Sequence, residues 1–397
     1  MQDRGEVVAL MEPLRLSAES RHYGELADLA MELGQKSAGF RRSLPASMLA
    51  SLATLVRSMN CYYSNLIEGH NTHPVDIERA LRNEYSQDAR KRNLQLEAKA
   101  HIEVQTWIDE GGLKDHALSA QGICTVHRRF CQLLPEDLLW IDDPQTKEHV
   151  YIQPGELRGR DVQVGDHVAI SPGAVPRFLA RFEEIYQPMG LAETVLHVAA
   201  AHHRLLWIHP FLDGNGRVAR LISHAVLLQR LETGAIWSVS RGLARQASTY
   251  KQLLANCDRS RRNDLDGRGN LSEEALAAFT RFFLETCIDQ VVFMENLMQP
   301  DRLRARVLLW AEEQVRLGEL PQKAIDILSA ILYRGDLPRG EAKLVTGLTS
   351  RQTRRIVEAL ANQNVLASNN PREPLRLAFP ASLGSRWMPG LFPEKTS

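Results

Sequence analysis

Apolar residues recur at steps of three and four along most of this chain, and this spacing constrains the fold more than any other feature of the sequence. Between residues 51 and 69 the apolar positions mark one face of a helix, and the series stops at Gly69, a residue type that ends many helices. The same spacing predicts helices from about Thr72 onward and over 93–110, 118–134, 175–187, 191–208, 217–231, 272–298 and 301–317. The chain is therefore predicted to be mainly α.

Two segments depart from the helical spacing. Residues 150–172 contain three glycines and an alternating Val162–Val164 pair next to Gly165, which predicts a short β-hairpin. From about residue 321 three short helices (322–333, 339–346 and 350–363) are followed by two strands (364–368 and 374–379), which is the layout of a winged helix, with Ser350 a suitable cap for the third helix. We therefore predict an N-terminal helical region (1–110), a central core (111–300), a linking helix (301–320) and a winged-helix domain (321–397).

The composition excludes several classes of protein. The 397 residues allow two or three domains, and with 44% hydrophobic and 24% charged residues the chain is neither disordered nor fibrous. The 48 basic residues equal the 48 acidic ones, so the whole chain is not an electrostatic binder of nucleic acid or membrane surfaces. The five cysteines are scattered and form no CxxC pair, and the chain shows neither a signal-peptide pattern nor a long uncharged run. We therefore expect a soluble, cytoplasmic protein with no membrane partner.

The predicted winged helix is basic although the chain is neutral. Residues 320–388 hold ten Lys/Arg and five Asp/Glu, an excess of 10 − 5 = +5 charges. The polar side chains early in its third helix, where such a domain presents residues to a DNA groove, are Arg351, Gln352, Arg354 and Arg355. Contact with DNA is one interpretation. A surface that docks a protein or a second copy, with a solvated basic face, is the other.

A compact motif joins helix 191–208 to helix 217–231: His209-Pro-Phe-Leu-Asp-Gly-Asn-Gly-Arg-Val-Ala-Arg220. Pro210 ends the first helix because it cannot donate the next backbone hydrogen bond. Gly214 and Gly216 flank Asn215, so successive amides can point into one concavity at the start of the second helix. Such a loop before a helix N-terminus is typical of a phosphate-binding site.

The side chains of the motif add the groups that phosphate chemistry needs. Asp213 is a hard oxygen ligand suited to Mg²⁺. Arg217 and Arg220 lie three residues apart, on one helix face, and can bind phosphate oxygens. His209 titrates near neutrality and can take a proton from an attacking hydroxyl. The segment therefore predicts a site for nucleotidyl or phosphoryl transfer.

These residues match every fixed position of HPFx(D/E)GNGRxxR, so the chain resembles the Fic family, over roughly residues 60–300. The resemblance implies a Fic-type helical bundle with a β-hairpin flap, and transfer of AMP from ATP to a Ser, Thr or Tyr hydroxyl of a target protein or of the chain itself. It implies that His209 is the general base and that Asp213 holds Mg²⁺. It also implies that the Gly214–Gly216 amides and Arg217 bind the α- and β-phosphates, and Arg220 the γ-phosphate.

The resemblance extends to residues outside the motif. The flap residues Val162, Val164 and Gly165 would align the target's hydroxyl-bearing segment. Tyr250 and Asn256 are candidates for the adenine pocket, although the local pattern differs from that of some relatives. Dimerisation is common in the family, so we expect a homodimer.

A second motif, Ser64-Asn-Leu-Ile-Glu68-Gly69, resembles the family's inhibitory pattern (S/T)xxxE(G/N). Ser64 and Glu68 lie four apart near the end of the predicted helix of about 52–69, so the Glu68 carboxylate can reach a guanidinium group. The resemblance implies that its partner is Arg220 and that this pairing keeps ATP out of the posture needed for transfer. Some relatives use the same glutamate to remove AMP, and the sequence leaves such a reverse activity open.

Two rival functions remain open at this point. The site could move another nucleotide, a phosphate or phosphocholine. The chain could also be a DNA-binding regulator whose Fic core senses a nucleotide. A metal site at the upstream histidines is not favoured, because no HExxH pattern occurs and the neighbours His202 and His203 cannot share a helix face. We expect one of these two in the core and the other in solvent.

Overall fold

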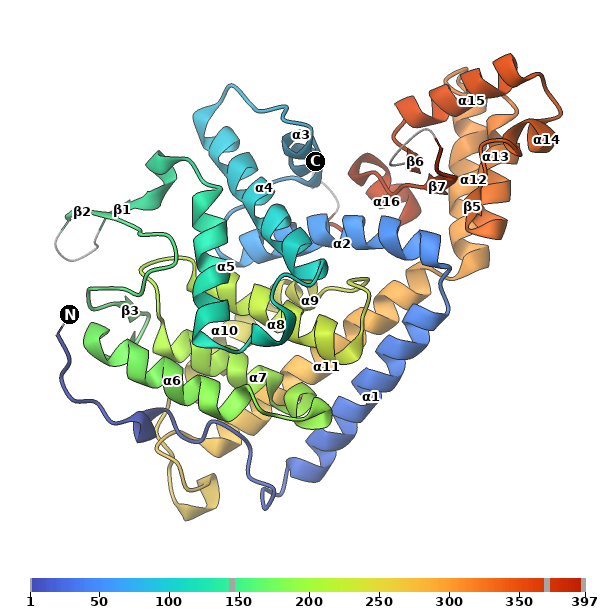
Figure 1. Ribbon diagram of the computed structural model, residues 1–397. Helices are drawn as coiled ribbons and strands as arrows, with labels where there is room; N and C mark the ends of the chain where they lie inside the picture. Colours follow the sequence, from blue (N-terminus) through green and yellow to red (C-terminus); the bar gives the residue numbers. More distant parts are fainter. Residues whose placement is uncertain (1, 143–146, 368–371, 394–397) are drawn as a thin grey trace.

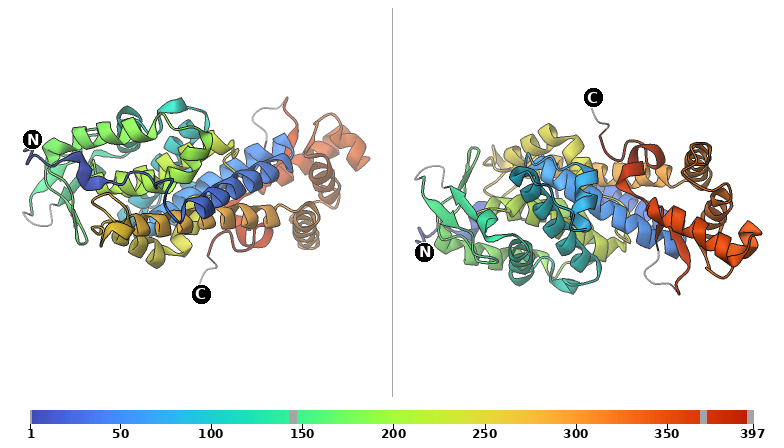
Figure 2. Two further views of the ribbon diagram at one scale, coloured as in Figure 1. Left: turned by 90° about the horizontal axis from the view of Figure 1, so that it is seen from below. Right: turned by 90° about the horizontal axis from the view of Figure 1, so that it is seen from above.

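The computed structural model describes residues 2–142, 147–367 and 372–393, and shows a mainly helical body with a smaller module at one end (Figures 1 and 2). The body consists of α1 (Tyr23–Arg42), α2 (Ala46–Ile67), α3 (Pro74–Leu81), α4 (Ala89–Asp109), α5 (Ala120–Gln132), α6 (Val175–Tyr186), α7 (Leu191–Ile208), α8 (Asn215–Leu231), α9 (Val239–Arg245), α10 (Ala247–Cys257) and α11 (Glu273–Leu297). The prediction of a mainly α chain is confirmed.

Three helices of the body were not predicted. In α1 the buried positions are Leu26, Ala30, Leu33, Ser37 and Phe40, and the small residues among them weaken the apolar spacing. The helices α9 and α10 are short and are separated only by Gln246, so neither offers enough turns for a periodic pattern.

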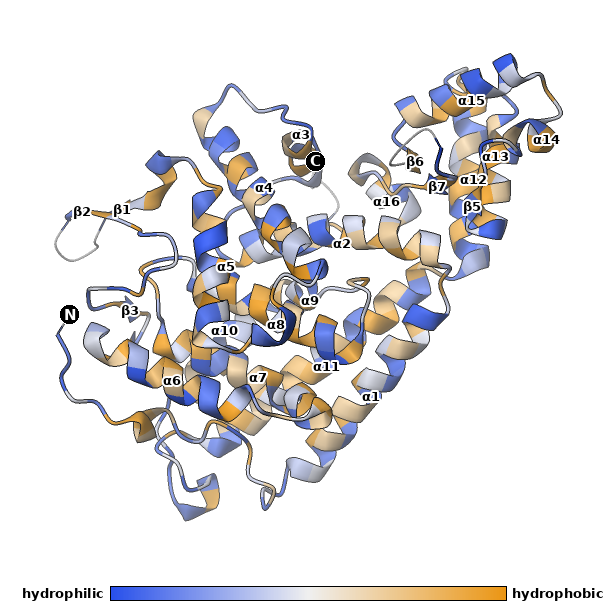
Figure 3. Cartoon of the chain, in the orientation of Figure 1, coloured by the Kyte–Doolittle hydropathy of each residue, from blue (hydrophilic) through white to orange (hydrophobic). Residues whose placement is uncertain are grey.

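Helix α7 lies at the centre of the body. It packs against α8, α11, α6 and α1, and its side chains are buried on all faces from Thr194 to Leu205. A helix that is buried all round is expected only in a multilayered core. Figure 3 shows the outer loops as mainly hydrophilic, whereas the long helices carry both hydrophobic and hydrophilic faces. The end of α7 is therefore a rigid support for whatever follows it.

The predicted hairpin is present as β3 (Gln163–Val164) and β4 (His167–Val168), an antiparallel pair whose turn contains Gly165 at φ +59°. Val162 lies just before β3, and its carbonyl accepts a hydrogen bond from the Ala169 amide at 3.2 Å. A second antiparallel pair, β1 (Trp140–Asp142) and β2 (His149–Tyr151), was not predicted. Both hairpins lie at the end of the body remote from the C-terminal module (Figure 1).

Helix α12 (Pro300–Arg316) leads into the C-terminal module, which consists of α13 (Ala324–Arg334), β5 (Asp336–Leu337), α14 (Ala342–Thr346), α15 (Ser350–Asn362), β6 (Leu366–Ala367) and β7 (Leu375–Leu377). The three strands form an antiparallel sheet in the order β5-β7-β6, and β5 was not predicted. Residue 368 of the predicted strand 364–368 lies outside the described residues. The order of helices and strands follows the one we expected for a winged helix.

The predicted cap of α15 is wrong by one residue. The N-cap is Thr349, whose side chain accepts from the Gln352 amide while the Gln352 side chain accepts from the Thr349 amide. This reciprocal pair requires Gln or Glu three residues after the cap, and Thr353 stands at that position for Ser350. The candidate DNA-contacting residues Arg351, Gln352, Arg354 and Arg355 are all exposed on the first turns of α15, and Arg354 also pairs with Glu358. Contact with DNA stays a prediction.

Residues 380–393, which we call the tail, return from the module to the body. The tail contains η6 (Ala381–Leu383) and α16 (Gly384–Trp387), and Trp387 packs edge-on against Trp310 of α12 with ring centroids 5.2 Å apart. The tail then returns to α2, where Leu391 and Phe392 contact Tyr63 and Tyr62. Among all described residues, no helix combines the length and the apolar character needed to cross a membrane.

Candidate active site

The His209-Pro210 corner ends α7 as the sequence predicts. His209 is the C-cap of this helix and adopts the left-handed conformation, with φ +51° and ψ +63°. A proline disfavours the α conformation in the residue before it, and a non-glycine residue with positive φ is uncommon and occurs often at functional sites. The corner therefore turns the imidazole out of the helix line.

The His209 ring is held in a form that can accept a proton. Its Nδ1 lies 3.3 Å from the Leu206 carbonyl oxygen, which can only accept, so Nδ1 carries the hydrogen and Nε2 keeps its lone pair. Burial lowers the pKa of His209 to about 4, because the charged imidazolium would lose its hydration. At neutral pH the ring is therefore a neutral base with a free Nε2.

Arg158 supports this corner and was not predicted. Its Nε donates to the His209 carbonyl at 2.7 Å, and its own amide donates to the Pro210 carbonyl at 2.9 Å. The guanidinium also donates to the carbonyls of Arg160 and Ile170, on either side of the hairpin. This buried side chain thus ties the motif to both ends of the flap.

The loop after the corner is fixed by Asn215. Its Oδ1 accepts from the Phe211 amide at 3.0 Å, and its Nδ2 donates to the Phe211 carbonyl at 2.8 Å. Phe211 in turn stacks on His127 with ring centroids 3.9 Å apart. The Asn215 side chain thus braces the loop, and the phosphate contact predicted for this residue is that of its backbone amide.

We expect Asn215→Ala to lower the free energy of unfolding by about 2–4 kcal/mol, because the buried Phe211 amide and carbonyl would both lose their partners. Urea denaturation monitored by circular dichroism measures this change. Asn296→Ala, at an exposed position near the end of α11, is the matched control and should change stability by less than about 0.5 kcal/mol. Equal stabilities for Asn215→Ala and the parent would contradict the bracing role.

Helix α8 begins at Asn215, two residues earlier than predicted, so Gly216 lies in its first turn. Gly214 precedes it at φ +80°, and no side chain caps the helix. The free amides and the helix dipole make this terminus attractive to anions. A Cβ built on Gly216 would lie 2.4 Å from Glu68 Oε1, so the Glu68 carboxylate sits directly against this first turn.

Glu68 also pairs with Arg220, as the resemblance implied. Arg220 Nη2 donates to Glu68 Oε1, while Arg220 Nε donates to Ser64 Oγ at 2.9 Å and Nη2 contacts the Ser64 carbonyl at 3.2 Å. Burial would raise the pKa of the Glu68 carboxyl, but the charge and hydrogen bond of Arg220 outweigh it, so the pKa is lowered. The Arg220 side chain is 2% exposed, and its donors are engaged by the end of α2.

Arg217 is engaged by two other carboxylates. Its Nη2 donates to Asp213 Oδ2 at 2.6 Å, and its Nη1 donates to Glu97 Oε1 at 2.5 Å. The Glu97 side chain is 13% exposed and its other oxygen contacts His70 Nδ1 at 2.7 Å, whereas the Asp213 side chain is 51% exposed. The hydrogen bond to Glu97 raises the pKa of His70. Glu97 is thus the buried, fixed partner of Arg217, and Asp213 the exposed one.

A cavity of about 780 Å³ brings some of the predicted residues together, but Asp213, Gly214, Asn215 and Arg217 are not part of its lining. Its lining includes His209, Gly216 and Arg220 from the motif, Glu68 from α2, Val164 and Gly165 from the flap, and Tyr250 from α10. Val162 is not part of the lining, since it precedes the hairpin. Asn256 is also outside it, because α10 presents Lys251, Leu254 and Ala255 to the cavity instead. The prediction for Asn256 is therefore not supported.

Tyr250 is a buried residue in the wall of the cavity, and a chain of hydrogen bonds holds its hydroxyl. The Ser223 hydroxyl donates to the Ala219 carbonyl, so it accepts from His202 Nδ1 at 2.8 Å, and His202 Nε2 then accepts from the Tyr250 hydroxyl at 2.7 Å. His203 is equally buried, with Nε2 at 3.0 Å from Asp258 Oδ1. The expectation that one of the two histidines faces solvent is wrong, because α7 is enclosed on all sides.

The residues present fit a magnesium ion only in part. In the described part of the chain no three His, Cys, Asp or Glu side chains are grouped as metal ligands. Mg²⁺ usually takes one or two carboxylates, with substrate phosphates and water completing its octahedron. The exposed carboxylate of Asp213, beside the open start of α8, suits such a shared site.

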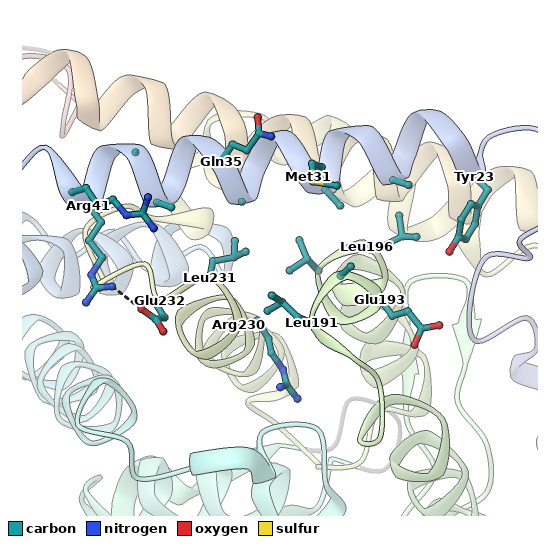
Figure 4. A pocket seen from close by; sticks show the side chains of 18 residues that line it. Tyr23, Met31, Gln35, Arg41, Leu191, Glu193, Leu196, Arg230, Leu231 and Glu232 are labelled. Atoms are coloured by element: carbon teal, nitrogen blue, oxygen red, sulfur yellow. Dashed lines mark hydrogen bonds and ion pairs between the residues drawn. The ribbon is translucent and has the colours of Figure 1, made fainter.

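A second cavity, of about 800 Å³, lies between α1, the start of α7 and the end of α8 (Figure 4). Its lining is largely apolar, with Met31 64% and Leu191 57% exposed. Charged groups stand at its ends, including the Arg41–Glu232 ion pair marked in Figure 4. None of the predicted site residues line it, and the homodimer stays a prediction.

Comparison with known proteins bears directly on this motif. A profile of the Fic/DOC family matches residues 117–227. The curated "Protein adenylyltransferase Fic" of Drosophila mojavensis is 25% identical over 230 residues, which are 57% of this chain and 40% of that protein. The protein of the same name from Drosophila erecta is 38% identical over 80 residues, 20% of this chain and 16% of that one. The chain thus matches less than half the length of these relatives.

Two solved structures share the fold. A Fic family protein from Desulfovibrio desulfuricans G20 superimposes with a TM-score of 0.53 at 16% identity, over 92% of this chain and 98% of that chain. Fic-1 (residues 134–508) from C. elegans gives a TM-score of 0.53 at 17% identity, over 70% of this chain and 73% of that chain. Residues 117–227 thus match the Fic/DOC family, and the chain shares its fold with these two Fic structures.

Proposed function

We propose that this protein is an adenylyltransferase that moves AMP from ATP to a side-chain hydroxyl of a target protein or of itself. One observation carries the proposal: the free Nε2 of His209, the first turn of α8 and Arg220 face one cavity beneath the flap. Two of the relatives are named protein adenylyltransferases, which supports the same class of reaction. Labelling of protein by radiolabelled ATP with Mg²⁺, dependent on His209, tests it.

In the proposed reaction His209 Nε2 takes the proton of the target hydroxyl as its oxygen attacks the α-phosphorus of ATP. The new P–O bond joins AMP to the side chain, and the bond to pyrophosphate breaks. The amides at the start of α8 and the guanidinium of Arg217 would stabilise the charge on the phosphates. Asp213 would hold Mg²⁺, which supplies charge neutralisation at the phosphate oxygens.

The same geometry supports inhibition by Glu68. Its carboxylate lies against the first turn of α8 and pairs with Arg220, so it stands where an anionic phosphate group would be bound. A nucleotide that enters must therefore displace this carboxylate or bind with its terminal phosphate elsewhere. Removal of AMP from a modified target, another proposed use of Glu68, would need water in the same cavity.

We expect the rate of AMP transfer not to fall near pH 6.5 through protonation of His209. Because burial lowers the pKa of His209 to about 4, the ring stays neutral and able to accept a proton at all higher pH values, and kcat/KM falls only as the pH drops through about 4. Initial rates at saturating Mg²⁺ between pH 4.5 and 8 measure this profile. A loss of rate centred near pH 6.5 that persists when each of the other histidines is replaced would contradict this expectation.

We expect Glu97→Gln to weaken ATP use about tenfold, chiefly through KM, because the hydrogen bond from Arg217 to a buried charged partner is replaced by a weaker neutral one. Steady-state kinetics in a Glu68→Gly background measure this effect. Glu103→Gln, on the exposed face of the same helix, is the matched control and should leave KM unchanged. Identical KM values for the two variants would argue against a role for Glu97.

A further inference from the structure

The tail contacts the helix that carries Ser64 and Glu68. The Tyr63 hydroxyl donates to the Leu391 carbonyl at 2.9 Å, and Leu391 is fully buried. The Tyr62 ring meets Phe392 edge-on, with centroids 5.7 Å apart and planes at 87°. Both tyrosines directly precede Ser64, whose hydroxyl accepts from Arg220. The tail is thus attached to α2 within two turns of the Glu68 carboxylate.

The tail also reaches the elements around this contact. Arg241 Nη2 donates to the Gly390 carbonyl at 2.7 Å, and its Cζ lies 3.6 Å from the centroid of the Phe293 ring of α11. The Ala381 amide donates to the carboxylate of Glu78 in α3. Because α3 follows the turn after Glu68, the tail touches the helices on both sides of the inhibitory residue.

The module contacts the start of α2 as well. A Cβ built on Gly335, at the end of α13, would lie 2.9 Å from both Pro45 and Ser47. Helix α2 is therefore held at its first turn by the module and near its last turn by the tail. An α-helix of 22 residues moves largely as a rigid body, so a shift at Tyr62 and Tyr63 displaces Glu68 too.

We propose that the tail holds α2 where Glu68 pairs with Arg220, and that release of the tail relieves the inhibition. The inference rests on the proposed function. The tail would be in equilibrium between an attached and a displaced state. A ligand shifts this equilibrium only if its affinities for the two states differ, so a partner of the C-terminal module would relieve inhibition if it binds the displaced state more tightly. The signal would then travel through α2, not through the cavity.

The test uses the full chain with Phe392→Ala, and AMP incorporation followed by intact mass. We expect a rise of about two- to tenfold over the parent, the effect of losing one aromatic pair from the state that it stabilises. Tyr63→Phe, which removes one hydroxyl and keeps the ring, should act in the same direction. Adding Phe392→Ala to Glu68→Gly should cause no further rise, because the inhibitory pair is already absent.

Arg386→Ala is the matched control, since Arg386 lies in the same tail but pairs with Glu313 of α12 on the surface. Thermal unfolding verifies that the variants remain folded.

If Glu68→Gly incorporates AMP while Phe392→Ala and Tyr63→Phe match the parent, the tail does not hold α2, and the proposed function stands. If Glu68→Gly incorporates none, the proposed function fails. In that case, hydrogen exchange at residues 62–70 tests whether the tail holds α2. Faster exchange in Phe392→Ala than in Arg386→Ala would support this role of the tail, and equal rates would overturn it.

Discussion

Replacing Glu68 by glycine is expected to raise AMP incorporation by about ten- to a hundredfold, because a charged hydrogen bond worth about 1.5–3 kcal/mol no longer competes with phosphate for Arg220. The change also clears the carboxylate from the first turn of α8, where it lies against Gly216. Intact-mass measurement after exposure to ATP and Mg²⁺ reads the effect directly, as the addition of one AMP unit per site, and includes modification of the chain itself.

A matched control exists in the same chain. Glu232 ends α8 as Glu68 ends α2, and it pairs with Arg41 at 2.8 Å on the surface, away from the His209 cavity. Glu232→Gly should therefore leave incorporation at the parent level. If Glu68→Gly and Glu232→Gly behave alike, the contact with Arg220 is not inhibitory.

Replacing His209 by alanine in the Glu68→Gly background should lower incorporation by roughly 10²–10⁴-fold, the usual contribution of a general base. The binding of ATP should change little, because the ring uses Nδ1 for the Leu206 carbonyl and the phosphates are assigned to α8 and the arginines. Incorporation and nucleotide affinity, measured on the same preparation, separate the two effects.

The control for this variant is His149→Ala, in the exposed hairpin β1–β2, which should keep full activity. Substantial incorporation by the His209→Ala variant, with ATP affinity intact, would show that another group takes the proton. A loss of both incorporation and ATP affinity would instead point to a damaged cavity.

The sequence predicted the parts of the site that are close together in the chain. The motif from His209 to Arg220 lies within one helix–loop–helix unit, and the spacing of Ser64 and Glu68 places both on one face of α2. The short hairpin with Gly165 was predicted from its glycines and alternating valines. Each of these features depends on residues that are close in the sequence, so the local backbone geometry is enough to predict it.

The residues that the sequence did not predict act over long separations. Glu97 is 120 residues from Arg217, and Arg158 is 51 residues from the His209 carbonyl that it supports. Neither stands in a pattern that distinguishes it from a surface charge, and only the packing of α4 on α8 and the course of the chain before the flap bring them into place. The same reason explains Asn256, because the phase of α10 decides which side chains reach the cavity.

The missing side chain of Gly216 has one more consequence. Glu68 and a nucleotide would both need the space that a single methyl group at this position would fill. Under the proposed function, a substitution at Gly216 would therefore disturb the inhibitory contact and the phosphate site together. Only changes in α2 or in the tail would alter the inhibition and leave the start of α8 unchanged.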